Sequence, residues 1–385
     1  MIWLFWICAA FLGYTFIGYP LLVWVASAIR ALPARRATIV PRVTLILSVY
    51  NEREIIAGKL KNTLALTYPR DKFQVIVCSD ASTDGTDDIV ASYGGAGIEL
   101  IRVTERRGKN HALMVAKEAS MGEILVFTDA GIQLACDAIE TIVANFADST
   151  VGVVSSEDQI IGRGVGTGEG AYIDFEMKLR RRESLLNSVV GASGSFFAAR
   201  AEVCRKWHPD QTSDFFVPLH AVEMGLRVVV DPLSIGYYDT ARSGKAEFQR
   251  KVRTIVNGLT VFFTHTALLN PLRYPIFSWQ MVSHKLFRWL LPVGFLLLLL
   301  SNLFLWNAGW FYRFSLLGQL LVYVTGATGL LIRSLAGFWP ARIASFFILG
   351  NVATLMAWVR FLRGEKFERW EPTRRNEHTS TAGVR

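Results

Sequence analysis

The chain has 385 residues, of which 51% are hydrophobic and 19% charged, and its mean hydropathy is +0.31. This composition excludes a disordered chain and is too apolar for an ordinary soluble enzyme, so we expect a membrane part beside a globular part. Lys and Arg outnumber Asp and Glu by 41 to 32, and the net charge of +9 fits an anionic lipid surface or a nucleotide diphosphate without implying nucleic acid. The four cysteines form no C-x-x-C pair, which disfavours a zinc site or a disulfide framework.

The first 29 residues carry no charge and exceed the ~20 residues that span a bilayer. A cleaved signal peptide is the alternative, but the start lacks a basic residue and the apolar stretch is long, so we predict a retained transmembrane helix. Residues 30–42 form a basic juxtamembrane linker with four arginines. Positive charge beside a span marks the cytoplasmic side, so the centre of the chain is expected in the cytoplasm.

Residues 43–265 have an ordinary composition, and short apolar runs alternate there with helical patterns. We predict strands at residues 43–49, 73–78, 98–103, 124–127 and 151–154. This alternation predicts an α/β domain with a mostly parallel sheet covered on both faces. Ligands of such sheets bind at the carboxyl ends of the strands, so polar residues at these ends are candidate site residues.

The C-terminal third is again apolar. Residues 266–288 mix aromatic with basic residues and suit an interfacial helix, and uncharged segments at 289–306, 314–332 and 343–359 predict transmembrane segments within 289–362. Three further spans place the basic tail, residues 363–385, outside, whereas its charges argue for the inside. Either one segment is re-entrant or interfacial, or the charge rule fails here; we favour a cytoplasmic tail.

Acidic and polar residues follow three of the predicted strands. Tyr50, Asn51 and Glu52 follow the first, Asp80 and Asp84 the second, and Asp129 the fourth. Carboxylates accept hydrogen bonds from a base or ribose and hold divalent cations. The alternative is structural, because Asp80 and Asp84 also suit an Asx turn and the cap of the next helix.

These segments share their order and spacing with a known family. They are Tyr-Asn-Glu at 50–52, Asp-Ala-Ser-Thr-Asp-Gly-Thr at 80–86, Gly-Lys-Asn-His-Ala-Leu at 108–113 and Thr-Asp-Ala-Gly at 128–131. Together they resemble the nucleotide-sugar half of the family 2 glycosyltransferases, whose fold is of the GT-A type. The resemblance continues through 168–176, 191–195, 212–215 and 250–253, and with its flanking spans the chain resembles cellulose synthase-like enzymes of the bacterial inner membrane that make exopolysaccharides.

The resemblance implies a role for each matching residue. Tyr50, Asn51, Glu52, Asp80 and Asp84 would surround the nucleoside, Lys109 would approach the diphosphate, and Asp129 would bind Mg²⁺ or Mn²⁺. Gly131 stands where the family's D-x-D element has its second acid, so the cation would rely on Asp129, phosphates, water and an unidentified ligand. Since Mg²⁺ typically uses one or two carboxylates plus phosphates, a single acid is physically admissible.

The resemblance also implies a general base at Asp214, here within Thr-Ser-Asp. An acceptor hydroxyl becomes a good nucleophile only when its proton is removed, and Arg250, Arg253 and Lys109 would neutralise the leaving nucleotide. The alternative for Asp214 is a helix N-cap. Gly191, Ser193 and Gly194 would form an acceptor rim, although such glycine-rich turns also occur for purely conformational reasons.

One departure concerns the Gln-x-x-Arg-Trp signature of processive members. Thr254 replaces the Trp and cannot stack on a sugar, with Trp207 or Trp370 as candidate substitutes. We therefore predict an inverting membrane enzyme that transfers sugar from a nucleotide diphosphate, with uridine expected, to a hydroxyl of a lipid-linked or growing saccharide. A processive synthase that translocates its product and a non-catalytic nucleotide-sugar-binding partner of a polysaccharide complex are the alternatives. A binding module needs no base, so Asp214 argues against the second.

Overall fold

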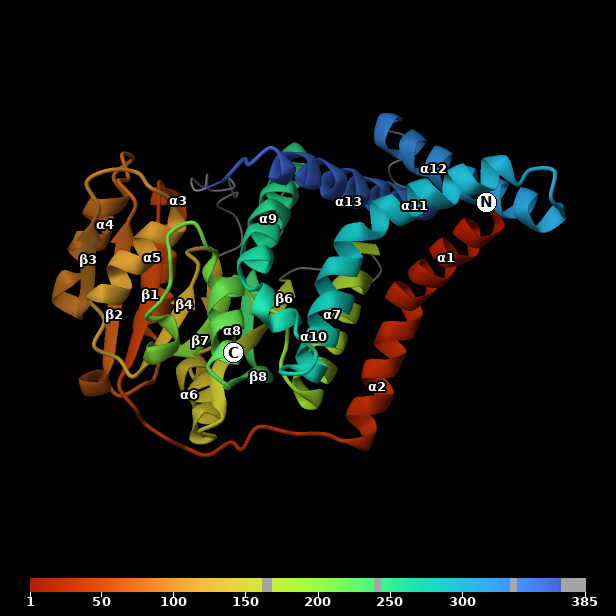
Figure 1. Ribbon diagram of the computed structural model, residues 1–385. Helices are drawn as coiled ribbons and strands as arrows, with labels where there is room; N and C mark the ends of the chain where they lie inside the picture. Colours follow the sequence, from red (N-terminus) through yellow and green to blue (C-terminus); the bar gives the residue numbers. More distant parts are fainter. Residues whose placement is uncertain (161–167, 239–243, 333–337, 368–385) are drawn as a thin grey trace.

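The computed structural model describes residues 1–160, 168–238, 244–332 and 338–367, with the side chains of 160, 168–172, 238 and 244–247 left aside. An α/β domain lies at one end of the molecule and long helices extend from its other side (Figure 1). Trp370 and most of the predicted tail lie outside the described residues.

The described residues form an eight-stranded sheet in the order β3-β2-β1-β4-β7-β6-β8-β5. Its strands are β1 (Val43–Val49), β2 (Phe73–Ser79), β3 (Ile98–Arg102), β4 (Ile124–Thr128), β5 (Ile132–Leu134), β6 (Val151–Ile160), β7 (Phe196–Arg200) and β8 (Arg227–Tyr238). The first four in spatial order are parallel, and β7 runs antiparallel to both of its neighbours. The predicted α/β fold is confirmed, and all five predicted strands are present.

Helices cover both faces of this sheet. They are α3 (Arg53–Leu64), α4 (Thr86–Ser92), α5 (Lys109–Glu118), α6 (Ala138–Val143), α7 (Gly168–Leu186), α8 (Ser213–Glu223) and α9 (Gly244–Thr264). Alternate residues of β1 enter opposite cores: Ile46 packs with the α5 and α8 side, and Leu45 and Leu47 pack with the α3 side. Because both faces are buried, the parallel strands are continuously apolar, which made them readable from sequence.

Strand β8 was not predicted, because a bulge interrupts it. Its pairing with β6 jumps from Val230 to Ile235, and Pro232, which lacks an N–H to donate, lies in the interval. The adjacent Asp231 is 1% exposed and accepts hydrogen bonds from Arg36 and Asn145. Arg36, from the predicted basic linker, therefore pairs with the α/β domain.

Four helices among the described residues are long and apolar enough to cross a membrane: Ile2–Ile29, Pro275–Phe304, Trp310–Leu331 and Trp339–Leu362. The first consists of α1 (Ile2–Gly13) and α2 (Tyr19–Ile29), and the second of α10 (Pro275–Met281) and α11 (Phe287–Phe304). A π-helical turn joins the halves of each pair. The two turns touch, because the Tyr14 hydroxyl lies 2.7 Å from Ser283 Oγ and accepts a bond from Trp279 Nε1. The remaining two helices are α12 and α13.

The start of the second long helix packs on the α/β domain. His284 is 1% exposed, and its ring nitrogens lie 2.6 Å from Glu183 Oε1 and 2.8 Å from Glu176 Oε1 of α7. Arg288 donates to the other oxygen of Glu176 at 2.5 Å. A buried charge network thus fastens the long helices to the domain, with its members mutually paired as buried charges require.

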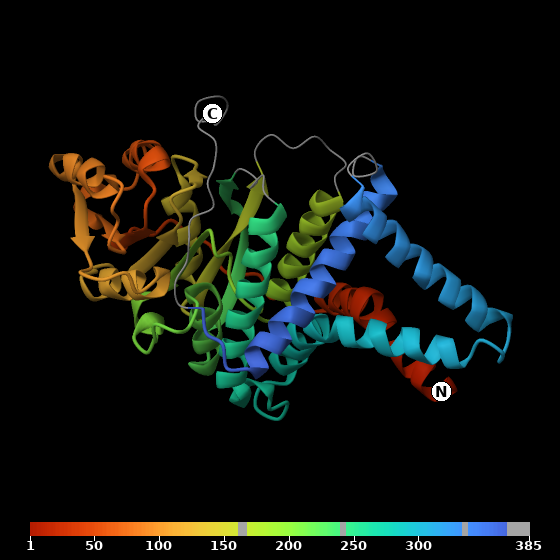
Figure 2. The ribbon, with the colours of Figure 1, turned by 90° about the horizontal axis from the view of Figure 1, so that it is seen from above.

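The last helix, α13, returns to the domain and crosses α9 (Figure 2). Ala353 and Ala357 bury Val252 and Val256 of α9, and beyond α13 the carbonyl of Phe367 accepts a hydrogen bond from Asn257. The chain enters α10 from the domain and is back on the domain here.

Candidate active site

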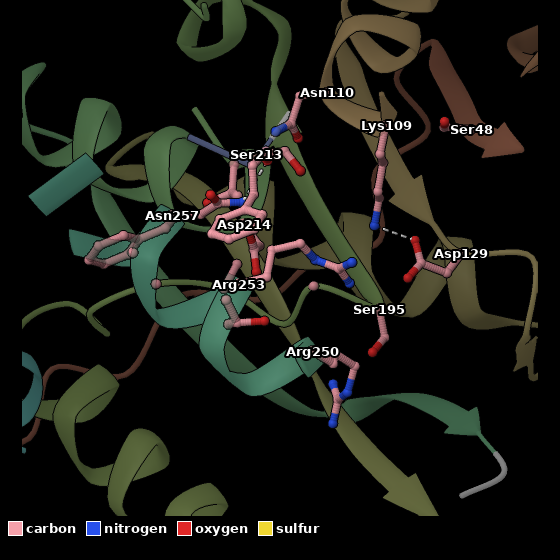
Figure 3. Close-up of a pocket in the computed structure, with 18 of the residues that line it drawn as sticks. Ser48, Lys109, Asn110, Asp129, Ser195, Ser213, Asp214, Arg250, Arg253 and Asn257 are labelled. Carbon is pink, nitrogen blue, oxygen red and sulfur yellow. Dashed lines mark hydrogen bonds and ion pairs between the residues drawn. The ribbon is translucent and has the colours of Figure 1, made fainter. Parts of the chain in front are cut away.

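A cavity of about 520 Å³ opens at the carboxyl ends of β1 and β4, between the sheet, α8, α9 and the start of α11. Eight of the predicted site residues line it: Glu52, Lys109, Asp129, Gly191, Gly194, Asp214, Arg250 and Arg253. Figure 3 shows Lys109 and Asp129 facing one another, with Asp214 and Arg253 across from them. The structure therefore brings together two acids that are far apart in the sequence, Asp129 and Asp214.

Asp80 does not line the cavity. It is 2% exposed, and its carboxylate accepts hydrogen bonds from the backbone N–H of Arg107 at 2.9 Å and of Gly108 at 2.8 Å. Gly108 has φ 98°, a conformation that favours glycine, and α5 begins at the next residue, Lys109. Asp80 thus fixes the backbone from which Lys109 enters the cavity.

The other predicted nucleoside residues also bond to nearby backbone. Asp84 accepts from the N–H of Thr86 and of Arg53, and these bonds outweigh burial and hold the pKa of Asp84 below its usual range. Asn51 Oδ1 accepts from the N–H of Thr83 at 2.8 Å. The guanidinium of Arg106 lies 3.7 Å from the ring centroid of Tyr50. Asp84 thus forms the Asx turn that was the structural alternative, although Gly85 and not Asp84 is the N-cap of α4. The contacts of these residues with a nucleoside remain proposals.

Lys109 and Asp129 form an ion pair inside the cavity, with Nζ 2.6 Å from Oδ1 and side-chain exposures of 28% and 37%. Burial by itself lowers the pKa of Lys109, but attraction to Asp129 and Asp214 and the hydrogen bond outweigh it, so the pKa lies above its usual range. Lys109 therefore carries an ammonium between the two carboxylates.

A second lysine, Lys59, bonds to both ends of the Asp129 loop, residues 129–131 between β4 and β5. Lys59 of α3 is fully buried, and its Nζ donates to Thr128 Oγ1 at 3.0 Å and to the carbonyl of Ile132 at 2.8 Å. Burial lowers the pKa of Lys59 to about 7. Sequence reasoning missed this residue, because a lone lysine in an amphipathic helix reads as exposed.

Asp214 is the second residue of α8, and Thr212 occupies the N-cap, so Asp214 is not the helix cap. Burial raises the pKa of Asp214, although the neighbouring ammonium of Lys109 opposes the rise. Gly194 passes close by, because a Cβ there would lie 3.0 Å from Asp214 Oδ2. The carboxylate is thus enclosed, faces the cavity and holds its proton more tightly than an ordinary aspartate.

The predicted acceptor rim wraps around Asp214. The N–H of Ala192 donates to the carbonyl of Asp214 at 2.7 Å, and Arg180 Nη2 donates to the carbonyl of Gly191 at 3.1 Å. Ser193 is 2% exposed and does not line the cavity; its hydroxyl donates to Asp158 at 2.6 Å. The rim therefore positions Asp214 and Asp158 with its own backbone and hydroxyl.

The cavity residues that sequence reasoning missed include Asp158 of β6, Lys285 and Trp289. Burial raises the pKa of Asp158, and the nearby Asp129 carboxylate adds to the rise. None of the three belongs to a motif, and only the fold brings them here. Trp207, a predicted substitute for the missing stacking residue, is buried against Phe127 instead, so Trp289 is an aromatic side chain that does reach the cavity.

A divalent cation fits the cavity only if a bound phosphorylated ligand also supplies oxygens to it. In the described part of the chain no three His, Cys, Asp or Glu side chains are grouped to hold a metal. Asp129 offers hard carboxylate oxygens suited to Mg²⁺ or Mn²⁺, and it already attracts the ammonium of Lys109. Asp129 would therefore hold the ion together with oxygens supplied by a phosphorylated ligand.

Comparisons with known proteins agree with this geometry. The structure superposes on that of the mannosyltransferase PcManGT from Pyrobaculum calidifontis, in complex with GDP-Man and Mn²⁺, with a TM-score of 0.73 and 27% identity over 94% of this chain and 100% of that one. Glycosyltransferase AglE of Haloferax volcanii is 28% identical over 159 residues, which are 41% of this chain and 52% of that protein.

A poly-beta-1,6-N-acetyl-D-glucosamine synthase of Staphylococcus aureus is 25% identical over 245 residues, or 61% of this chain and 59% of the synthase. The chain thus spans about half the length of the curated relatives it matches. The family model described as glycosyl transferase family 2 matches residues 44–207, which run from β1 through the Asp129 loop to β7. Residues 44–207 are therefore a glycosyltransferase family 2 domain of the GT-A fold.

Proposed function

We propose that this chain is a membrane-integrated, inverting glycosyltransferase that transfers a sugar from a nucleotide diphosphate to a hydroxyl of a lipid-linked or growing saccharide. One observation carries the proposal: a single cavity holds cationic side chains suited to a diphosphate opposite an enclosed carboxylate suited to proton abstraction. The relatives, which include a polysaccharide synthase and a glycosyltransferase, support the same reaction class.

The polar end of the cavity would bind the donor. Lys109, Arg250 and Arg253 line it and match the negative charge of a diphosphate. GDP-Man and Mn²⁺ bound to the Pyrobaculum mannosyltransferase support a nucleotide sugar and a divalent ion here, with Asp129 as the protein ligand. When bound, such an ion supplies positive charge to the leaving diphosphate. We propose a uridine nucleotide, and guanosine is the competing choice.

Asp214 would act as the general base. It accepts the proton of the acceptor hydroxyl as that oxygen forms a bond to the anomeric carbon, while the bond from this carbon to the phosphate oxygen breaks. Lys109, Arg250 and Arg253 stabilise the charge that gathers on the departing nucleotide diphosphate. A single displacement from the face opposite the leaving group inverts the anomeric configuration.

The acceptor would approach from the membrane end of the cavity. Lys285 and Trp289 line that end, and both belong to the long helix Pro275–Phe304. A lipid-linked saccharide could therefore present its hydroxyl to Asp214 without leaving the bilayer surface.

The substitution Asp214→Asn tests this assignment. We expect transfer, measured as nucleotide release from a panel of UDP- and GDP-sugars with a membrane-lipid extract as acceptor, to fall by ~10²–10⁴-fold because the base is lost. Binding of UDP or GDP, measured by calorimetry, should persist, because Asn keeps the shape of the site. Since burial raises the pKa of Asp214, wild-type transfer should also decline as the pH falls toward that pKa and the carboxylate becomes protonated.

The matched control is Asp210→Asn, four residues earlier, where the carboxylate bonds to Lys366 at 3.1 Å outside the cavity lining. Its transfer rate should stay near that of wild type. Unchanged transfer by the Asp214 variant would remove this residue from the mechanism and favour the non-catalytic partner. The length distribution of the product separates the processive alternative, which predicts long chains from one binding event.

A further inference from the structure

The ion pair between Lys109 and Asp129 occupies one of the two carboxylate oxygens that Asp129 can offer to a divalent cation. Lys109 Nζ lies 2.6 Å from Asp129 Oδ1, within the range of a charge-assisted hydrogen bond (Figure 3). An ammonium and a divalent ion repel one another, so the ammonium at this oxygen lowers the affinity of Asp129 for a divalent ion. Asp129 is therefore paired with a cation that the protein itself supplies.

We propose that Lys109 competes with the divalent cation for the carboxylate of Asp129. The competition ends when a nucleotide diphosphate binds, because its phosphate oxygens then accept the hydrogen bonds of the ammonium. This inference rests on the proposed function, in which Asp129 binds the ion and Lys109 the diphosphate. Its consequence is an order of binding: the ion enters with the nucleotide, and the protein alone binds it weakly.

The missing second acid makes this competition effective. Gly131 lines the cavity where a D-x-D element has a carboxylate, so Asp129 faces Lys109 without that support. Lys109 also lies in the field of Asp214, which adds to its attraction to this part of the cavity. An ion without phosphate ligands would have to bind beside the ammonium or displace it, and it would rely on one carboxylate and water.

The backbone allows the exchange without a rearrangement of the fold. Asp80 fixes the N–H groups of Arg107 and Gly108, and Lys109 begins α5, so its Cα is held. The four-carbon side chain is 28% exposed within the cavity and moves by rotation about its own bonds. The ammonium can therefore pass from Asp129 to an adjacent phosphate while the loop stays in place.

The test is a titration of the purified full-length protein with Mn²⁺, followed by electron paramagnetic resonance, without nucleotide and with UDP or GDP. We expect Lys109→Met to bind Mn²⁺ at least about tenfold more tightly than wild type when no nucleotide is present, because a charge-assisted bond no longer competes. Lys285→Met removes a positive charge from the same cavity without touching Asp129, and it should change Mn²⁺ affinity much less.

The gained binding must depend on Asp129, so the double variant Lys109→Met with Asp129→Asn should lose it. Equal Mn²⁺ affinity of wild type and Lys109→Met without nucleotide, including undetectable binding by both, would overturn the inference. Failure of the proposed metal role looks different: with nucleotide present, Asp129→Asn alone would then bind Mn²⁺ as wild type does. Melting temperatures close to that of wild type confirm that the variants are folded.

Discussion

The two sides of the cavity are built differently. On the β1–β4 side, side-chain oxygens of the motif residues accept hydrogen bonds from backbone N–H groups and thereby fix the loops. These residues are Asn51, Asp80 and Asp84. On the β6–α11 side, residues from separate segments converge, and Asp158 and Trp289 face the cavity without belonging to any motif. Motif residues of the β1–β4 side therefore fix loop backbone, whereas Asp158 and Trp289 are brought to the opposite side by packing alone.

The largest effect should come from removing the loop-ordering carboxylate. Asp80→Ala leaves two N–H groups without their acceptor, the part-buried one of Arg107 and the buried one of Gly108, and we expect a loss of roughly 3–5 kcal/mol in unfolding free energy. Denaturant unfolding in detergent measures this. Asp129→Ala provides the contrast: its carboxylate is 37% exposed, so stability should change by less than about 1 kcal/mol while nucleotide-dependent Mn²⁺ binding disappears. Equal destabilisation by both would erase the distinction between the two kinds of acid.

A pH effect should arise from Lys59. Its folded pKa of about 7 lies below the unfolded value of 10.5, so the unfolded chain holds more protons between these values and stability rises with pH there. The penalty of the buried charge is full below pH 7 and disappears toward pH 10.5. Between pH 7 and 10 we expect wild type to gain roughly 3 kcal/mol relative to Lys59→Met.

The control for this experiment is Lys61→Met on the same helix, where the side chain is exposed. Its stability should follow the wild-type dependence on pH. A Lys59→Met protein with the same pH dependence as wild type would show that Lys59 is not buried as a charge under the Asp129 loop.

The smallest effect concerns the opposite side of the cavity. Gly194→Ala would place a Cβ 3.0 Å from Asp214 Oδ2, so the carboxylate or the loop must shift by a few tenths of an ångström. We expect roughly tenfold slower transfer, equivalent to about 1.4 kcal/mol, with nucleotide binding unchanged. At Gly95 a Cβ meets nothing within 4 Å, so Gly95→Ala serves as the control. If slower transfer came with weaker nucleotide binding, Gly194 would belong to the donor side instead.

The same contrast explains which strands and which site residues could be predicted from the sequence. Buried parallel strands such as β1 are continuous apolar runs, so they and the alternating fold were predictable. Strand β8 was not, because Pro232 and the bulge interrupt its pattern, and β5 has only three residues. Asp129 and Asp214 were predictable as a pair only through the family resemblance, since 85 positions separate them.

The remaining site residues could not be predicted because their chemistry depends on burial and contacts. Lys59 differs from Lys61 only in the face of the helix that it occupies. Asp158 becomes a cavity acid because β6 ends beside the Asp129 loop, and Trp289 because the long helix Pro275–Phe304 packs against α9. These relations join segments distant in sequence, and no local pattern encodes them.

The most direct test of the central claim is an experimental structure of the full chain with Mn²⁺ and the nucleotide sugar that the donor panel selects. We predict that the diphosphate lies against Lys109, that the ion bridges it to Asp129, and that Asp214 faces the anomeric carbon across the cavity. A nucleotide bound outside this cavity, or a sugar whose anomeric carbon is turned away from Asp214, would contradict the account.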